Sequence, residues 1–222
     1  MDNRPVYRCH WRGQLTTEDQ ETLRPMLEQC EEKAQAMKAA GQLMTAALYY
    51  FGRQIFLYYE ALGEELPPES FMDALAPVLA PWPQKEDTRL WAKMYHIYWH
   101  DVPRSADDWQ RAKAPERRRG RIAYLKHETM FQYVYHHFAI VQEGKLCGDR
   151  YQSIALHEDV LFSYFEEPRS HVNILRDPAQ ESQAIQGWMD VNPEAHFIPL
   201  PGSEGANFLL LPEYFAVGMQ DG

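Results

Sequence analysis

The chain has few cysteines and no long apolar run. Cys9, Cys30 and Cys147 are too few and too widely spaced for a disulfide framework, and none has a second cysteine or histidine at zinc-site spacing. No segment approaches the roughly 20 apolar residues that a membrane-spanning helix needs, and the N-terminus lacks the apolar stretch of a signal peptide. We therefore expect a cytoplasmic protein without disulfides, metal sites or membrane attachment.

Basic residues are also in the minority. The 222 residues include 22 Lys and Arg against 32 Asp and Glu, a formal net charge of −10, whereas binding to nucleic acid needs clustered positive charge. We interpret the one basic run, Arg117-Arg118-Arg119 with Arg121, as part of a solvated linker. The sequence contains no phosphate-binding loop, dinucleotide fingerprint or Ser/His/Asp order, so we expect no nucleic-acid partner and no cofactor.

What the sequence does have is apolar residues and an internal repeat. Hydrophobic residues make up 45% and aromatic residues 13%, which suffices for a packed core. Segments 45–63 and 152–170 each contain an apolar run, a short polar turn, an apolar run with aromatics, and an acidic exit. With turns at Gly52 and at His157-Glu158-Asp159, both segments are typical of β-hairpins.

Helical patterns flank each hairpin. Residues 17–40 and 128–142 carry apolar side chains at helical spacing and end at Gly41 and Gly144, and Thr17 is the expected N-cap of the first. Shorter helical stretches follow at 68–79 and 177–189. The extended segments that open and close each half are 6–12, 90–100, 121–127, and 197–200 with 208–211.

Each half therefore has the order βαββαβ, the ferredoxin-like order, in which both helices cover one face of an antiparallel sheet. We predict an α+β protein with a first repeat over residues 1–104, a polar linker over 105–120 and a second repeat over 121–222. Aromatic side chains expected on the other face, such as Tyr58 and Phe162, would be exposed unless the two sheets pack together.

This arrangement resembles the dimeric α+β barrel superfamily, in which two such units close one barrel around a ligand pocket. Here both units come from one chain. The resemblance implies a monomer that is a pseudo-dimer, or a weak homodimer, with a small-molecule ligand.

A second resemblance concerns the second half. Segment 132–143, QYVYHHFAIVQE, resembles the first helix of the L-rhamnose mutarotase family, in which a tyrosine and a histidine four residues later belong to the sugar site. Tyr133 and His137 match that pair. The hairpin at 151–166 is similar to the family's central hairpin, and Trp188 lies near the position of a tryptophan pair, although Tyr151 replaces an asparagine of the family. The resemblance implies that Tyr133 and His137 are catalytic.

Residue spacing is compatible with that role. Side chains four residues apart project from the same side of a helix, so Tyr133 and His137 can reach one ligand. Anomer exchange moves protons at neutral pH, which suits an imidazole with a pKa of about 6.5. The alternative is that both side chains only pack along the helix. His136 and His137 diverge too far to share a metal ion.

The strand predicted at 90–100 carries a second group of polar aromatics. Alternation places His96, Tyr98 and His100 on one side of this strand. If that side lines the barrel, these residues would form an aromatic-walled polar pocket suited to a sugar or a flat ring. The predicted ligand-binding residues are His96, Tyr98, His100, Trp188 and Tyr124.

Three functions remain open. The first is a mutarotase-like isomerase that acts on a monosaccharide. The second is a non-catalytic binding or structural barrel, which the absence of tyrosine and histidine from the helix at 17–40 favours. The third follows the cofactor-independent monooxygenases and haem-binding proteins of the barrel superfamily.

Overall fold

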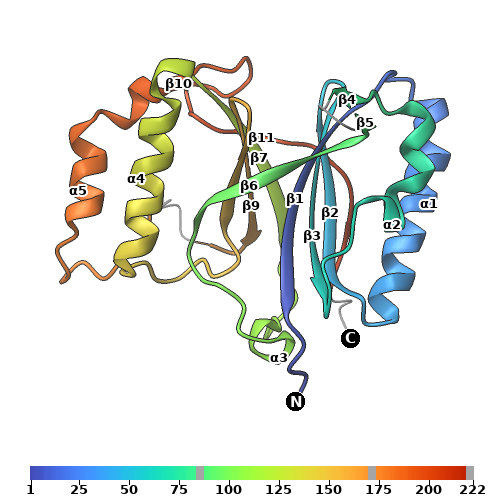
Figure 1. The fold of residues 1–222 in the computed structure, drawn as a ribbon, viewed down its shortest axis with the longest axis horizontal. Helices are drawn as coiled ribbons and strands as arrows, with labels where there is room; N and C mark the ends of the chain where they lie inside the picture. The colour runs from blue at the N-terminus through green and yellow to red at the C-terminus, as the bar shows by residue number, and fades with distance from the viewer. Residues whose placement is uncertain (84–87, 170–173, 219–222) are drawn as a thin grey trace. The chain divides into compact units, whose positions relative to one another are not determined.

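The computed structural model describes residues 1–83, 88–169 and 174–218, which form two compact units. Unit 1 draws on residues 1–94, 103–115 and the segment from Leu211 onward, and unit 2 on 95–102 and 116–210. Both units combine helices with antiparallel strands (Figure 1), so the prediction of a mixed α+β protein is confirmed. Ser170, the last residue of the second predicted hairpin, lies outside the described residues.

The elements of unit 1 are β1 (Val6–Gln14), α1 (Gln20–Ala39), β2 (Leu43–Phe51), β3 (Gln54–Leu62), α2 (Glu69–Met72), the 3-10 helix η1 (Asp73–Val78), β4 (Trp82–Pro83), β5 (Thr88–Arg89), the first part of β6 (Trp91–Trp99), α3 (Ala106–Trp109) and β12 (Glu213–Val217). The elements of unit 2 are the second part of β6, β7 (Arg117–Leu125), η2 (His127–Thr129), α4 (Met130–Glu143), β8 (Ser153–His157), β9 (Val160–Glu167), α5 (Gln183–Asp190), η3 (Pro193–His196), β10 (Phe197–Ile198) and β11 (Leu209–Leu210).

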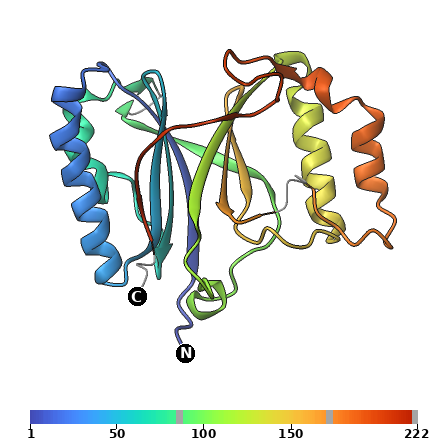
Figure 2. The same cartoon turned by 180° about the vertical axis from the view of Figure 1, so that it is seen from behind.

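Unit 1 is an antiparallel arrangement of strands in the order β6-β1-β3-β2-β12. The hairpin predicted at Gly52 is present as β2 and β3, and Gly52 has the positive φ of 55° that its turn requires. Helices α1 and α2 lie along one face of these strands (Figure 1), where Leu23 and Cys30 pack against Leu57. Strand β12, which pairs with β2 (Figure 2), was not predicted.

The first helix begins later than expected. Asp19, not Thr17, is the N-cap of α1, because the Asp19 carboxylate accepts hydrogen bonds from the backbone N–H groups of Glu21 and Thr22. Thr17 lies two residues earlier, and its hydroxyl accepts a hydrogen bond from the backbone N–H of Asp19 at 3.1 Å. The helix ends at Ala39 and is followed by Gly41 with a φ of 69°, as its sequence predicted.

The second helix of unit 1 is split. The sequence predicted one helix over 68–79, whereas the structure has the short α2 followed by η1. Pro77 explains the change, because proline has no N–H for an α-helical bond and its ring clashes with the carbonyl four residues earlier, at Asp73. Asp73 is the residue at which α2 gives way to η1.

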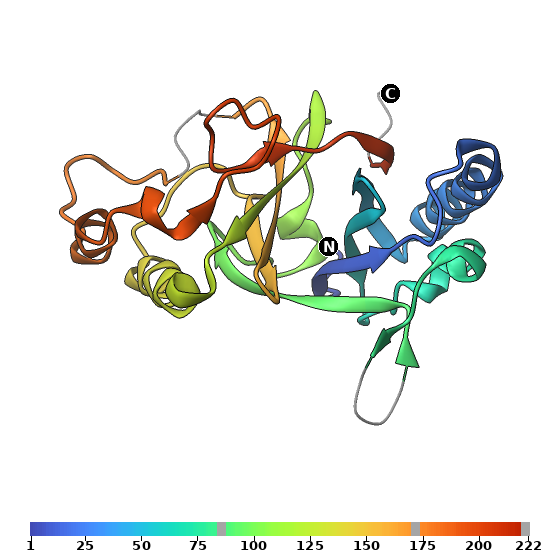
Figure 3. The same ribbon diagram turned by 90° about the horizontal axis from the view of Figure 1, so that it is seen from above.

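Unit 2 has the strand order β10-β7-β9-β8-β6, again antiparallel, and β11 also pairs with β7. The predicted turn at 157–159 joins β8 and β9. Helices α4 and α5 lie side by side on one face of these strands (Figure 3). Between the two layers Leu125 and Leu161 of the strands pack against Tyr133, Ile140 and Trp188 of the helices.

Both helices of unit 2 have clear ends. As predicted, α4 ends at Gly144, which has a left-handed φ of 69°. Helix α5 starts at Gln183 instead of the predicted residue 177, because the Ser182 hydroxyl accepts a hydrogen bond from the backbone N–H of Ile185 and caps the helix. Ser182 in turn donates to the Glu143 carboxylate at the end of α4, which ties the two helices together.

The segment 105–120, expected to be a polar linker, contains α3 and the first residues of β7. Its polar character is explained in part by a buried ion pair within unit 1. Arg111 Nη1 lies 2.5 Å from Glu60 Oε2, and the two side chains are 3% and 0% exposed. Trp109 and Tyr58 also donate to Glu60, at 2.9 and 2.5 Å. In the described ranges, no helix is long and apolar enough to cross a membrane.

Candidate functional site

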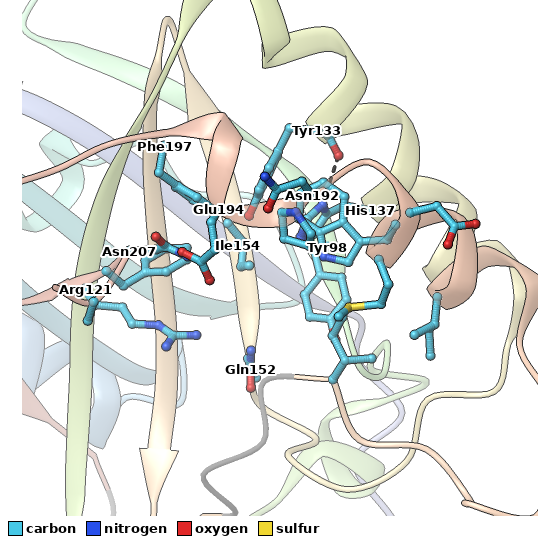
Figure 4. A pocket seen from close by; sticks show the side chains of 18 of the residues that line it. Tyr98, Arg121, Tyr133, His137, Gln152, Ile154, Asn192, Glu194, Phe197 and Asn207 are labelled. Atoms are coloured by element: carbon cyan, nitrogen blue, oxygen red, sulfur yellow. Dashed lines mark hydrogen bonds between the residues drawn. The ribbon is translucent and has the colours of Figure 1, made fainter.

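A pocket of about 760 Å³ lies within unit 2. It is bounded by the helix-covered face of the strands, by α4 and α5, and by the segment 192–208 (Figure 4). The strands and their ends contribute Tyr98, Arg121, Gln152 and Ile154. The helices contribute Tyr133, His137 and Trp188, and the later segment contributes Phe197 and Phe208.

Tyr133 and His137 form the helical side of this pocket. Their rings are stacked with centroids 3.8 Å apart, and both side chains are almost fully buried. His137 Nδ1 lies 2.9 Å from the backbone carbonyl oxygen of Tyr133 (Figure 4), so Nδ1 must carry the proton that makes this hydrogen bond. In the neutral ring Nε2 is then a hydrogen-bond acceptor, and it has no partner among the described residues.

Burial changes the acid–base properties of this pair. It lowers the pKa of His137 to about 4, and the neighbouring His136 and His196 act in the same direction. His137 is therefore neutral at pH 7, and its pKa lies below the value of about 6.5 of an unperturbed imidazole. Burial also raises the pKa of the Tyr133 hydroxyl, which stays protonated.

Aromatic rings surround the pair. Trp188 lies edge-on to both, with centroids 5.4 Å from Tyr133 and 4.9 Å from His137. Phe197 contacts Tyr133 at 5.6 Å in the same manner. The ring centroid of His196 lies 4.8 Å from that of Trp188, and His196 Nε2 lies 3.0 Å from Gln132 Oε1. Such walls suit the face or edge of a flat ligand ring.

Arg121 brings a positive charge to the opposite side of the pocket. Its side chain donates from Nε to Ser163 Oγ at 3.3 Å and stacks on Phe208 and Phe165 at 4.4 and 5.2 Å. It is only 8% exposed, and burial followed by repulsion from Arg169 lowers its pKa to about 10. Arg121 is thus still protonated at neutral pH.

The predicted site residues divide into three groups. Tyr98, Tyr133, His137 and Trp188 line the pocket. His100 contacts it indirectly, through a 3.0 Å interaction between its Nε2 and the Tyr98 hydroxyl. The remaining two predicted residues, His96 and Tyr124, are not part of the lining.

The difference at His96 comes from an irregularity in β6. Its register against β8 shifts between His96 and Tyr98, so that two steps on β6 match one step on β8. A bulge of this kind breaks strict alternation, so His96 and Tyr98 do not share a face as predicted. Ile97 and Tyr98 both join the core of unit 2 instead.

The alternation of β7 explains both a misassigned and a missed residue. Ala123 and Leu125 belong to the core beneath the helices, so Arg121 lies on that face and Tyr124 on the opposite one. Sequence reasoning assigned Arg121 to a solvated run, yet its spacing from Ala123 and Leu125 was a usable signal. Gln152 was missed in the same way, two residues before the buried Ile154.

Other kinds of site are not seen in the described part of the chain. Residues 1–83, 88–169 and 174–218 contain no group of three or more His, Cys, Asp or Glu side chains arranged to hold a metal ion.

No protein-family model and no curated protein matches the sequence, so the resemblance to the L-rhamnose mutarotase family gains no support. Solved structures similar to the chain include a "putative monooxygenase" from Lactobacillus acidophilus NCFM, at a TM-score of 0.48 and 6% identity over 95% of this chain and 96% of that one. A second "putative monooxygenase", from Fusobacterium nucleatum subsp. nucleatum ATCC 25586, has a TM-score of 0.43 and 9% identity over 98% and 96% of the two chains.

A haem-binding protein from Thermus thermophilus has a TM-score of 0.38 and 11% identity over 96% of this chain and 94% of that one. Because these TM-scores and identities are low, we base neither fold nor function on them.

Proposed function

We propose that unit 2 binds a small organic molecule with a flat ring in its pocket, and that His137 Nε2 accepts a hydrogen bond from a ligand hydroxyl. The observation that carries this proposal is the pairing of a neutral, buried His137 with Tyr133 inside an aromatic-walled cavity. The fixed Nδ1–H tautomer leaves one acceptor in a pocket wall that is otherwise mostly apolar.

The test uses naphthol as the probe, because it is flat and carries one hydroxyl. We expect binding by titration calorimetry and a change in the His137 Nε2 nitrogen resonance. His137→Phe keeps an aromatic ring but removes the acceptor, and should weaken naphthol binding by about 3- to 10-fold, as loss of one neutral hydrogen bond does. Tyr135→Phe, on the exposed side of the same helix, is the matched control. No binding, or an equal effect of both substitutions, would refute the proposal.

An isomerase of the mutarotase type is a second version of this function. The pair Tyr133 and His137 favours it, because both side chains line one pocket. The lowered pKa of His137 counts against it, since an efficient acid–base group titrates near the working pH. NMR exchange between sugar anomers, measured for several monosaccharides with the wild type and His137→Ala, decides this version: acceleration that the substitution abolishes would support it.

The monooxygenase-like and haem-binding versions can be separated in the same way. Haem binding would shift the Soret absorption band of added haemin, and His137→Ala should abolish this shift if Nε2 would be a ligand to the iron. Oxygen uptake in the presence of naphthol and without added cofactor would support the monooxygenase-like version.

We further propose that the two units are tandem copies of one ferredoxin-like repeat in a single-chain α+β barrel. In both units the strands follow the order fourth, first, third, second: β6-β1-β3-β2 and β10-β7-β9-β8. Two helices follow the same strands in each. The proposal predicts a monomer in sedimentation, and a crystal structure in which the corresponding strands and helices did not superpose would refute it.

A further inference from the structure

The pocket lining includes two buried hydrogen-bond donors, Arg121 and Gln152, that lack acceptors for part of their N–H groups among the described residues. The first is Arg121, whose side chain makes a single hydrogen bond within the described part of the chain, from Nε to Ser163. It forms no ion pair with any residue that the structure describes. A buried guanidinium without a carboxylate partner is costly, and proteins ordinarily pair such a charge.

The second donor is the side-chain amide of Gln152. It is 1% exposed, and its Oε1 accepts a hydrogen bond from Arg169 Nη1 at 2.8 Å, which fixes the orientation of the amide. The other end, Nε2, is buried and has no hydrogen-bond partner within residues 1–83, 88–169 and 174–218. A buried N–H group in this state has lost its hydrogen bond to water without gaining one from the protein, which is unfavourable. Gln152 and Arg121 line the same pocket (Figure 4).

The charges around the pocket are arranged unevenly. Arg176, also in the lining, donates to the backbone carbonyls of Asp177 and Gln180, so it adds a second cation. The carboxylates in the lining, Asp190 and Glu194, are exposed at the rim, and neither pairs with Arg121. Both carboxylates and Arg176 therefore lie in the more exposed part of the lining, whereas the buried part contains the cation Arg121 and the amide donor of Gln152 without a carboxylate.

We propose that the natural ligand of unit 2 is a flat aromatic carboxylate, whose two oxygens are bound by Arg121 and by Gln152 Nε2. This inference rests on the proposed function, and it adds the chemical class of the ligand. A guanidinium fork and an amide donor match the two oxygens of a carboxylate, and the ring occupies the space between the aromatic side chains. The ligand carboxylate then provides the negative charge beside Arg121 that no described residue provides.

Naphthoate and naphthamide test this class, because they have nearly the same shape and differ in charge. Titration calorimetry on the whole chain should show that naphthoate binds more tightly than naphthamide. Arg121→Met should weaken naphthoate by about 10- to 100-fold, since hydrogen bonds to charged groups contribute about 1.5–3 kcal/mol. Naphthamide should bind the variant nearly as well as the wild type. Glu128→Gln, which removes an exposed carboxylate outside the pocket lining, is the control and should leave naphthoate binding unchanged.

Each other outcome has a distinct meaning. If both probes bind and Arg121→Met changes them equally, the carboxylate class is wrong while the pocket still binds a ring. If neither probe nor naphthol binds, the proposed function fails together with the inference. If Arg121→Met does not fold, Gln152→Glu provides the test. This substitution places a carboxylate next to the proposed position of the ligand carboxylate, and the two negative charges repel each other. That variant should lose the preference for naphthoate, and an unchanged preference would overturn the proposal.

Discussion

His137 is a residue whose chemistry is set by its surroundings more than by its type. Its side chain is 5% exposed and its pKa is lowered to about 4, so the folded protein does not bind the proton that an unfolded histidine takes up near pH 6.5. The unfolded state therefore binds more protons as the pH falls from about 6.5 to about 4. Stability should be complete above this range and decrease through it, by about 2–4 kcal/mol in all.

The measurement is the free energy of unfolding at pH 4.5 to 7 for the wild type and for His137→Asn, which keeps a polar side chain without titrating. Other ionisable groups of the protein contribute to the pH dependence as well, so the informative quantity is the difference between the two proteins. The variant should show a shallower pH dependence. Parallel curves would mean that His137 is accessible to protons in the folded state.

Glu60 presents the opposite case, a buried residue that stays charged. Its burial alone would raise the pKa, but the positive charge of Arg111, with hydrogen bonds from Arg111, Tyr58 and Trp109, lowers it below the ordinary value. Glu60→Gln would remove the buried carboxylate that pairs with Arg111, and we expect the free energy of unfolding to fall by about 3–5 kcal/mol. Denaturant unfolding measures this loss.

The matched control is an exposed ion pair of the same unit. Lys33 Nζ lies 2.5 Å from Asp73 Oδ1, and both side chains are about half exposed. Asp73→Asn should cost only about 0–1 kcal/mol, because water screens this pair. Equal losses for Glu60→Gln and Asp73→Asn would show that burial does not decide the strength of the Glu60 pair.

Two glycines of unit 2 differ in backbone conformation: one ends a helix with a positive φ, and the other lies inside a helix. Gly144 ends α4 with a φ of 69°, which an alanine adopts only at a cost, so Gly144→Ala should destabilise the protein by about 1 kcal/mol. Gly187 lies inside α5, where a methyl group would meet only His136 at an ordinary 3.7 Å. Gly187→Ala should therefore stabilise it by about 0.5–1 kcal/mol. Thermal unfolding of both variants tests the opposite signs, and shifts in the same direction would contradict the assignment.

The helices and strands could be predicted from the sequence where they depend on nearby residues, and could not where they depend on distant ones. Local signals were sufficient for α1, α4 and both hairpins, because apolar spacing, Gly144 and the turn at Gly52 act within a few residues. They were insufficient where distant partners decide. Strand β12 exists because β2 offers it a free edge, and the buried state of Arg111 depends on Glu60, about 50 positions earlier.

The site shows this limit most clearly. Tyr133 and His137 were identified from the resemblance to the L-rhamnose mutarotase family, and their spacing on one helix was compatible with a shared site. The bulge that separates His96 from Tyr98, in contrast, was not predicted from the sequence. The environment of Arg121 depends on Ser163 and Phe165 of β9 and on Phe208 just before β11. The lowered pKa of His137 follows from burial, which spacing alone does not provide.

At the scale of the whole molecule, we expect a ligand in the pocket to stabilise unit 2 and to leave the stability of unit 1 unchanged. Its described lining comes entirely from unit 2, while unit 1 has its own hydrophobic core around Leu23, Leu57 and Phe71. A ligand stabilises the parts of a protein whose opening would release it. Hydrogen exchange with saturating naphthoate should therefore slow in α4, α5 and β7 and stay unchanged in α1 and β2.

Arg121→Met serves as the control for that experiment, because at the same naphthoate concentration it should reduce the protection of unit 2 without altering exchange in α1. Protection that extended equally through α1 and β2 would mean that the two units open as one cooperative body. A ligand bound to unit 2 would then stabilise the entire chain, and the division into two compact units would not describe how the protein unfolds.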